Sequence, residues 1–182
     1  MKALPAASAF FLSELPHLER CSAGRPVLDL ACGRGRQAVP AARRGLRVMG
    51  IDRDADSLRE LAQRAAPESL PLSAVRADLE SGRGIPAKSG AFGGILVFRF
   101  LFRPLVGAIV DALAPGGLLL YETFTIDCAE LDYGPRNKAF LVQHGEFPEL
   151  FAKLEIQSHW EGWTEGEHPL SVARLVARRR TA

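Results

Sequence analysis

The chain has 182 residues, of which 47% are hydrophobic and 24% charged, and its formal net charge is +2. This composition excludes a disordered chain and a strongly basic nucleic-acid-binding protein, and it allows one domain with a sizeable core. The three cysteines, Cys21, Cys32 and Cys128, have no metal-binding spacing, so we expect a reduced, cytoplasmic setting without a metal site.

Helical and strand-like segments alternate along most of the chain. Amphipathic spacing and Glu14 favour a helix over a signal peptide near the N-terminus. Such alternation is typical of a parallel sheet covered by helices on both faces. In chain order the pattern predicts a helix at 6–20, a strand at Val27–Ala31, a helix at 36–44, a strand at Leu46–Asp52, a helix at 54–66 capped by Asp54, strands at Leu72–Arg76 and Gly94–Phe98, a helix at 104–113, and a strand at Leu118–Phe124.

The end of the chain has a different rhythm. A short helix at 147–154 precedes two strand-like segments, Glu155–Trp163 and Leu170–Arg178. Their connection, Thr164–Pro169, is too short for a crossover helix, which predicts an antiparallel hairpin. We therefore expect a single α/β domain over residues 1–182. Its sheet would be Rossmann-like, doubly wound and seven-stranded, mostly parallel with an antiparallel C-terminal hairpin strand.

The stretch VLDLACGRGRQAVP at 27–40 predicts a strand, a glycine loop and a helix around a nucleotide cofactor. Gly33 to Ala38 fits the dinucleotide pattern Gly-x-Gly-x-x-Gly/Ala, so an NAD-dependent oxidoreductase is one interpretation. Three features favour another cofactor. Asp29 suits an ammonium group better than a pyrophosphate, Asp78 can accept from an adenine amine, and the sheet ends in an antiparallel strand.

These features resemble the class I S-adenosylmethionine-dependent methyltransferases. The motifs that carry the resemblance span most of the chain: VLDLACGRG at 27–35, GID at 50–52, ADL at 77–79 and LAPGG at 113–117. A closer likeness is to the TehB-type methyltransferases, named for tellurite resistance, through RFLFRPL at 99–105, YETFT at 121–125 and GEF at 145–147. One departure is Phe92-Gly93, where many relatives have Phe-Asp.

The resemblance implies one bound S-adenosylmethionine. Glycines in the loop would let the backbone approach it, Asp29 would lie near its amino-acid portion, and Asp52 would accept its ribose hydroxyls. Asp78 and the Leu79 backbone would contact adenine, and Phe98 would end the fourth strand near the transferred methyl group. The predicted cofactor-binding residues are Asp29, Ala31, Gly33, Arg34, Gly35, Asp52, Arg53, Asp78, Leu79 and Phe98.

The predicted acceptor residues are Arg99, Arg103 and His144. Arg99 and Arg103 are four apart, so one helical turn can present both guanidinium groups to a small anionic or polar molecule, and Arg136 can join them. The alternative for Arg103 is a structural ion pair with Glu122. His144, in an expected lid at 127–146, is the candidate proton acceptor, with an exposed loop histidine as the alternative.

The leading hypothesis is a methyltransferase acting on a small molecule, with residues 1–20 as a helix covering the site. A module that binds the cofactor without transferring a methyl group, and an NAD-dependent oxidoreductase, remain alternatives. RNA methylation is weaker, because the positive charge is scattered among 21 acidic residues. No apolar run approaches the ~20 residues of a membrane span. We therefore expect neither a nucleic acid nor a membrane as partner, and the oligomeric state is open.

Overall fold

The computed structural model describes residues 4–22, 24–135 and 137–181. Its strands are β1 (Val27–Leu30), β2 (Val48–Asp52), β3 (Leu72–Arg76), β4 (Phe92–Phe98), β5 (Leu113–Phe124), β6 (Glu155–Trp163) and β7 (Ser171–Arg178). Its α-helices are α1 (Ala9–Ser22), α2 (Ala38–Arg43), α3 (Ala55–Ala65), α4 (Val106–Ala112) and α5 (Glu146–Leu150). Short 3-10 turns are η1 (Ala66–Glu68), η2 (Arg103–Leu105), η3 (Ile126–Glu130) and η4 (Lys138–Phe140).

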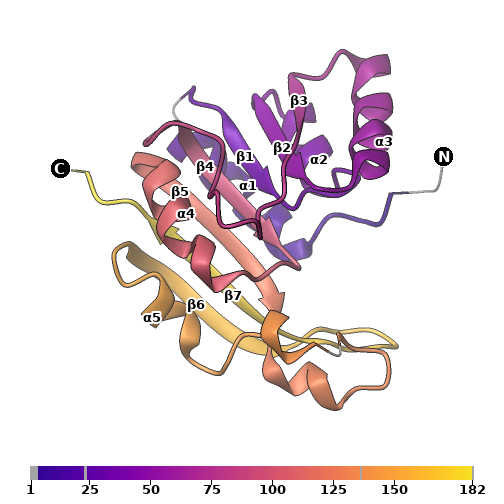
Figure 1. Ribbon diagram of the computed structural model, residues 1–182, viewed down its shortest axis with the longest axis vertical. Coiled ribbons are helices and arrows are strands. Elements are labelled where there is room, and N and C mark those ends of the chain that lie inside the picture. The colour runs from indigo at the N-terminus through magenta and orange to yellow at the C-terminus, as the bar shows by residue number, and fades with distance from the viewer. Residues whose placement is uncertain (1–3, 23, 136, 182) are drawn as a thin grey trace.

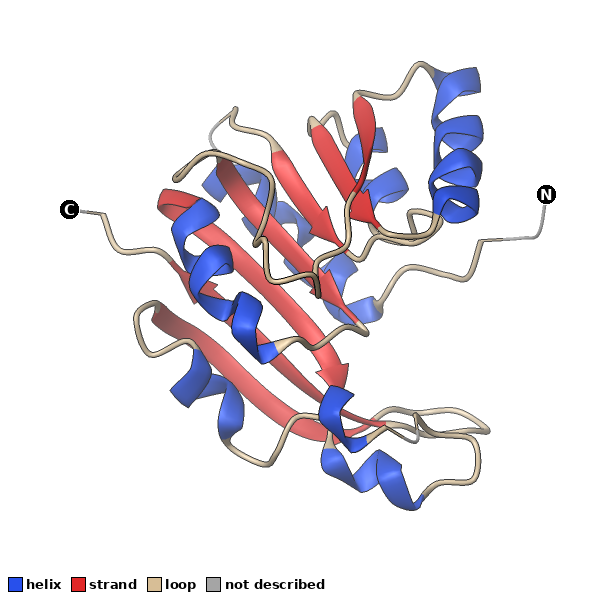
Figure 2. Ribbon diagram, viewed as in Figure 1, coloured by secondary structure: helices blue, strands red, loops and turns tan. Residues whose placement is uncertain are grey.

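The strands form one seven-stranded sheet in the order β3-β2-β1-β4-β5-β7-β6 (Figures 1 and 2). Strands β1 to β5 pair in parallel, and β7 is antiparallel to both β5 and β6. The predicted α/β sheet and its C-terminal hairpin are confirmed. The predicted bounds of β3 and β6 are correct to the residue, and Asp54 caps α3 by accepting from the Asp56 backbone N–H.

The largest difference from the predicted elements lies around Pro115–Gly117. The sequence predicts a turn there, but β5 runs through these residues from Leu113. The pairing of β5 with β4 shifts register between Phe92 and Gly94, which accommodates the extra residues as an irregularity within the strand. The predicted helix at 104–113 is correspondingly shorter and begins with η2, which contains Pro104.

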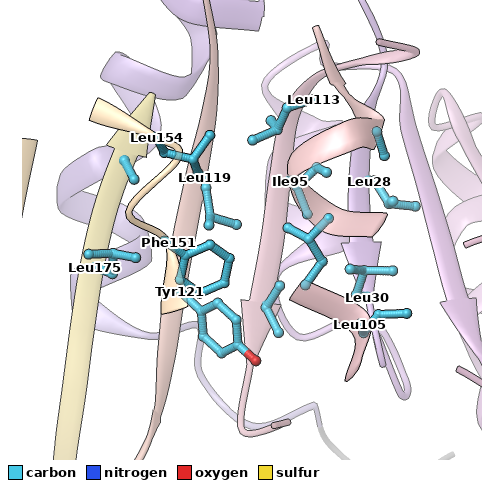
Figure 3. Packing of buried hydrophobic residues seen from close by; sticks show 14 of the residues in the cluster. Leu28, Leu30, Ile95, Leu105, Leu113, Leu119, Tyr121, Phe151, Leu154 and Leu175 are labelled. Atoms are coloured by element: carbon cyan, nitrogen blue, oxygen red, sulfur yellow. The ribbon is translucent and has the colours of Figure 1, made fainter. Parts of the chain in front are cut away.

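Two apolar layers cover the sheet. Residues of α1, α2 and α3, including Phe11 and Leu61, pack against Leu96 and Leu120 on one face. On the other face, α4 and α5 pack over Ile95 and Tyr121, and Figure 3 shows the Tyr121 and Phe151 rings beside each other. Neighbouring residues of β4 therefore point to opposite layers, as expected for a strand buried on both sides.

The Gly93-Gly94 pair brings α1 close to β4. A Cβ atom at Gly93 would lie 2.3 Å from the Ser22 carbonyl oxygen, and one at Gly94 would lie 2.3 Å from Leu18 Cδ1. This contact explains the departure from Phe-Asp at Phe92-Gly93, because any side chain at Gly93 would collide with the α1 backbone. No helix in the described part of the chain is long and apolar enough to cross a membrane.

Candidate functional site

The carboxyl ends of the parallel strands lie along one edge of the sheet (Figure 1). Three adjoining cavities lie at this edge, two of them at β1 to β4 and the third next to β5 and the β6–β7 hairpin. The Asp52 cavity, about 350 Å³, is lined among others by Asp52, Arg53, Asp78, Leu79 and Phe124. The Asp29 cavity, about 360 Å³, is lined among others by Asp29, Gly33, Arg34, Arg36 and Phe98. The tryptophan cavity, about 590 Å³, is lined among others by Trp160, Trp163, Phe124, Arg36, Glu122 and Arg174. Arg99 borders all three cavities.

Asp52 connects the end of β2 to the glycine loop that follows β1. Its Oδ2 accepts a 2.8 Å hydrogen bond from the Gly33 backbone N–H, and its Oδ1 accepts a 2.9 Å bond from the Asp54 backbone N–H. These bonds fix the carboxylate at the end of β2, where it is half-buried. Since each carboxylate oxygen has two lone pairs, both oxygens can still accept from a ligand in the Asp52 cavity.

The far side of the Asp52 cavity comes from the end of β3. Asp78 is exposed and Leu79 is buried, and the Asp78 carboxylate accepts from the Glu80 backbone N–H at 2.9 Å. An ion pair of 2.8 Å between Arg53 and Glu80 connects the ends of β2 and β3 at this cavity. The predicted residues Asp52, Arg53, Asp78 and Leu79 are therefore brought together around one cavity.

Asp29, in β1, is buried beside the second cavity. Burial raises the pKa of its carboxyl group to about 7, opposed by a hydrogen bond from the Ala38 backbone and by the Arg36 guanidinium. A buried carboxyl group with this pKa is ionised readily when a cation binds next to it. The Asp29 cavity therefore suits a positively charged group.

The two glycines of the loop have different roles. Gly33 has φ +51°, and a Cβ atom there would meet nothing within 4 Å, so its backbone borders open space in the Asp29 cavity. At Gly35, φ is +87° and a Cβ atom would lie 2.2 Å from Leu61 Cδ1. Gly35 lies outside the lining of these three cavities, and the missing side chain lets the loop pack against α3; its contact with the cofactor stays a prediction.

Cys32 lies behind the same loop, packed against Gly50. A Cβ atom at Gly50 would lie 2.8 Å from the Cys32 sulfur. Burial raises the pKa of this thiol, so it stays protonated and poorly nucleophilic. Packing behind the loop therefore accounts for this residue.

Arg99 and Ala31 have left-handed backbone conformations, with φ +57° and +53°. They follow the adjacent strands β4 and β1, and both border the Asp52 and Asp29 cavities. Non-glycine residues in this conformation are strained and cluster at functional sites. The Arg99 guanidinium lies over the Phe124 ring at 5.9 Å and makes no ion pair within the described part of the chain.

Arg103 does not line any of these three cavities. Its guanidinium pairs with both oxygens of Glu146, at 2.5 and 2.8 Å, and donates to the Ala139 and Leu141 carbonyl oxygens. Arg103 therefore forms a structural ion pair, the predicted alternative, but its partner is Glu146 rather than Glu122. Glu122 instead pairs with Arg174 at 2.8 Å.

His144 is also away from the three cavities. Its Nε2 lies 2.9 Å from Asp127 and its Nδ1 lies 2.9 Å from Glu161. Hydrogen bonds to these carboxylates raise the His144 pKa and favour the protonated ring. The structure thus places the ring between two carboxylates, and its role as proton acceptor stays a prediction. Arg136 lies outside the described residues.

Sequence reasoning missed four residues that the cavities bring together: Arg36, Arg174, Trp160 and Trp163. Arg36 directly follows the second loop glycine, and this position was a usable signal. The two tryptophans lie in the predicted strand at 155–163, and they are 44% and 50% exposed. Among the described residues, no cluster of His, Cys, Asp and Glu side chains is arranged to hold a metal ion.

Comparisons with known proteins agree on one fold and one family. Residues 27–117, half of the chain, match a family model described as a methyltransferase domain. A ubiquinone biosynthesis O-methyltransferase of Psychrobacter cryohalolentis is 28% identical over 130 residues, which cover 69% of this chain and 48% of that protein. The chain thus spans about half the length of the curated relatives that it matches.

Two solved structures share the fold. TehB from Haemophilus influenzae superposes with a TM-score of 0.75 at 20% identity, covering 92% of this chain and 62% of that one. Geranyl diphosphate C-methyltransferase from Streptomyces coelicolor, solved with S-adenosyl-L-homocysteine, has a TM-score of 0.67 at 16% identity, covering 92% and 77%. Both likenesses extend over nearly all of this chain.

Proposed function

Because this chain belongs to the methyltransferase-domain family, we propose that it binds S-adenosylmethionine and transfers the methyl group to a small anionic molecule. Methyltransferases of this family bind that cofactor or its product, as the Streptomyces structure illustrates. The observation that carries the proposal is the convergence of three strand-end carboxylates on two cavities that meet at Arg99. Ligands of parallel α/β sheets bind at this end of the strands.

The residues present fit the cofactor. Asp29 matches its ammonium group, Asp52 matches two ribose hydroxyls, and Asp78 with the Leu79 backbone matches the adenine edge. The open space beside Gly33 provides room for close contact with the backbone. The sulfonium group would then lie between the two cavities, next to their shared residues Ala31 and Arg99.

The charges around this point support an anionic acceptor. Arg36 and Arg99 border the Asp29 and tryptophan cavities together, and in the described part of the chain neither has an ion-pair partner. Burial lowers the pKa of Arg36, and the Arg99 guanidinium lowers it further. The sulfonium would add a third positive charge. An anion between these groups balances the charge, and planar guanidinium groups orient oxyanions well.

The bound cofactor supplies a methyl group that its sulfonium already activates for transfer. The chain's task is to hold the acceptor in line with the sulfur–methyl bond, a positioning effect of roughly 7–11 kcal/mol in favourable cases. As the sulfur–carbon bond breaks, a bond forms between the methyl carbon and the anionic acceptor atom. The positive and negative charges cancel, so no proton has to leave the acceptor. Arg99 would orient the acceptor, and Phe98 would flank it.

Two finer assignments belong to this proposal. Membership of the TehB-type subgroup is supported by the motifs at 99–105 and 121–125 and by the TehB neighbour. Transfer, rather than cofactor binding alone, is supported by the open tryptophan cavity next to Arg99, which leaves room for an acceptor. The Asp29 carboxylate, which borders the same cavity as Gly33, disfavours the NAD alternative, because it would repel a pyrophosphate.

Calorimetry and thermal melts with S-adenosylhomocysteine, S-adenosylmethionine and NADH test the proposal. A ligand at a hundred times its dissociation constant adds about 2.7 kcal/mol of stability, so the first two should raise the melting temperature and NADH should not. Transfer of a labelled methyl group from S-adenosylmethionine to a panel of small anions then tests the reaction. A melting temperature unmoved by all three ligands, or moved only by NADH, would contradict the proposal.

A further inference from the structure

The tryptophan cavity is the largest of the three, and both tryptophans of the chain line it. Trp160 is 44% exposed and Trp163 is 50% exposed. Two indole rings left open to solvent in a concave site with a polar rim are characteristic of a ligand-binding surface. The cavity lies beside the first residues of α1, at the ends of β5 and of the β6–β7 hairpin.

The floor of the cavity is a flat part of the sheet. Trp160, Arg174 and Glu122 are direct neighbours across β6, β7 and β5. In the next row, Gly162, Val172 and Phe124 are paired in the same way. A Cβ atom at Gly162 would lie 2.5 Å from the Trp160 ring, so the missing side chain lets the indole fold down along its own strand. This arrangement builds a planar aromatic wall.

Contacts with Arg174 hold that wall in place. The Arg174 guanidinium lies 4.7 Å from the Trp160 ring centre and 5.6 Å from that of Phe10, and it pairs with Glu122 at 2.8 Å. Arg174 is therefore already occupied by the protein. The guanidinium groups that border the cavity without an ion-pair partner in the described residues are those of Arg36 and Arg99.

The cavity is larger than a small inorganic anion requires. About 10–15 Å³ of space open to a water-sized probe holds one water molecule, so an oxyanion of a few atoms would leave most of the 590 Å³ unfilled. The lining combines the aromatic rings of Phe124, Trp160 and Trp163 with the guanidinium groups of Arg36 and Arg99, and the Arg99 guanidinium lies over the Phe124 ring. Flat aromatic rings next to cationic groups match a molecule that has a planar body and one anionic group.

We propose that the methyl acceptor is a small planar aromatic acid. Its ring lies against Trp160 and Trp163, and its anionic oxygens face Arg99 and Arg36. This inference rests on the proposed function and specifies the substrate class of the same site. Methyl transfer to the acid's oxyanion breaks the sulfur–methyl bond, forms an oxygen–methyl bond and releases neutral S-adenosylhomocysteine, so no base is required.

Tryptophan fluorescence tests the inference directly, because both tryptophans of the chain line this cavity. The protein, loaded with S-adenosylhomocysteine, is titrated with benzoate, cyclohexanecarboxylate and sulfate, and free N-acetyltryptophanamide corrects for absorption by the probe. We expect saturable quenching by benzoate, at least tenfold weaker binding of cyclohexanecarboxylate, and no response to sulfate. The single-tryptophan variants Trp160→Phe and Trp163→Phe should both retain the benzoate signal.

Variants test separately the arginine and the tryptophan side chains of the tryptophan cavity. Arg99→Gln should weaken benzoate binding at least tenfold, whereas Arg59→Gln, an exposed arginine on α3 that lines none of the three cavities, should leave it unchanged. Trp163→Leu should weaken benzoate about tenfold without changing the affinity for S-adenosylhomocysteine. Trp163 is half exposed, so this variant is expected to fold.

Three results would overturn the inference. If S-adenosylhomocysteine binds but benzoate gives no saturable quenching, the acceptor class is wrong while the proposed function stands. Equal binding of benzoate and cyclohexanecarboxylate, or saturable binding of sulfate, would also refute an aromatic acid. If S-adenosylhomocysteine itself does not bind, the proposed function fails and the acceptor assignment fails with it.

Discussion

The two halves of the sheet differ in the interactions that stabilise the chain after the carboxyl ends of the strands. At β1, β2 and β3, the Asp52 carboxylate is fixed by backbone N–H groups of Gly33 and Asp54. After β5, the described residues of the segment 125–146 make backbone hydrogen bonds, such as that from the Val142 N–H to the Phe124 carbonyl oxygen. They also make side-chain ion pairs, chiefly Arg103–Glu146 and the two carboxylates around His144. We call these regions the cofactor side and the acceptor side.

The difference concerns how far apart in the chain the partners are. On the cofactor side, each carboxylate follows or ends its own strand, so the parallel sheet brings the groups together once the strands pair. On the acceptor side, Arg103 meets Glu146 and Arg174 meets Glu122 only after the segment and the hairpin have docked. The first region therefore depends on strand topology, and the second depends on particular side chains that can be changed singly.

On the cofactor side, removal of the Asp52 carboxylate should cause the largest loss of affinity for the cofactor. Asp52→Ala should weaken S-adenosylhomocysteine binding at least tenfold, about 1.4 kcal/mol or more, because the ribose acceptor and the anchor of Gly33 are lost together. Isothermal titration calorimetry measures the change. Asp56→Ala, which removes an exposed carboxylate on α3, is the matched control and should bind normally. Unchanged affinity in Asp52→Ala would remove the ribose assignment.

The pH dependence of cofactor binding tests the role of Asp29, which lies on the same side. Its pKa of about 7 means that roughly one tenth of the carboxyl groups are ionised at pH 6 and nine tenths at pH 8. If the ionised form pairs with an ammonium group, affinity for S-adenosylhomocysteine should rise by up to about tenfold over this range. Calorimetry at both pH values measures it, and Asp29→Asn should remove the dependence.

The raised pKa of Asp29 also predicts how the stability of the free protein depends on pH. Since burial raises its pKa above the ordinary value of 3.8, the folded chain retains a proton that the unfolded chain has lost between about pH 4 and pH 7. The contribution of Asp29 to stability therefore falls as the pH rises through this window. Urea unfolding should show that the free energy of unfolding of Asp29→Asn falls less over this pH range than that of the wild type. An equal fall in both proteins would show that burial does not raise the pKa of Asp29.

These two sides also differ in what the sequence could reveal. The sheet, the glycine loop, and Asp29, Asp52 and Asp78 were predictable, because each motif sits at the end of its own strand and parallel strands end at one edge. The role of Gly35 was not, since the reason for that glycine is Leu61 on a different helix. A pattern of residues identifies a position, but not always the atom that a side chain there would meet.

The acceptor side was predicted less well for a physical reason. Arg103 and Arg99 are close in sequence, yet the residues between them are not helical and η2 begins only at Arg103, so one arginine pairs with Glu146 while the other borders three cavities. His144 could be singled out from the sequence, but its two carboxylate partners, each 17 residues away, could not. Ion-pair partners are set by the packing of distant segments, and no local spacing indicates which carboxylate an arginine will meet.

On the acceptor side, breaking one ion pair should reduce stability without touching the cofactor. Arg103→Gln should lower the free energy of unfolding by about 1 kcal/mol, a value discounted because the Arg103 side chain is 34% exposed. Affinity for S-adenosylhomocysteine should stay the same. Urea unfolding and calorimetry on one preparation measure both quantities. A large loss of cofactor affinity would contradict the separation of the two sides.

His144 provides the smallest and most specific test of that separation. Its carboxylate partners raise its pKa above the ordinary 6.5, so its contribution to stability is fully present below pH 6.5 and is lost as the pH rises through the folded-state pKa. His144→Gln carries no such charge, and its melting temperature should fall less than that of the wild type between pH 6 and pH 9. Glu161→Gln removes one partner and should reduce the fall in the same direction. Because His144 is 57% exposed, the effect should be modest. Identical profiles for all three proteins would mean that Asp127 and Glu161 do not hold a charged ring, and that other contacts fix the segment.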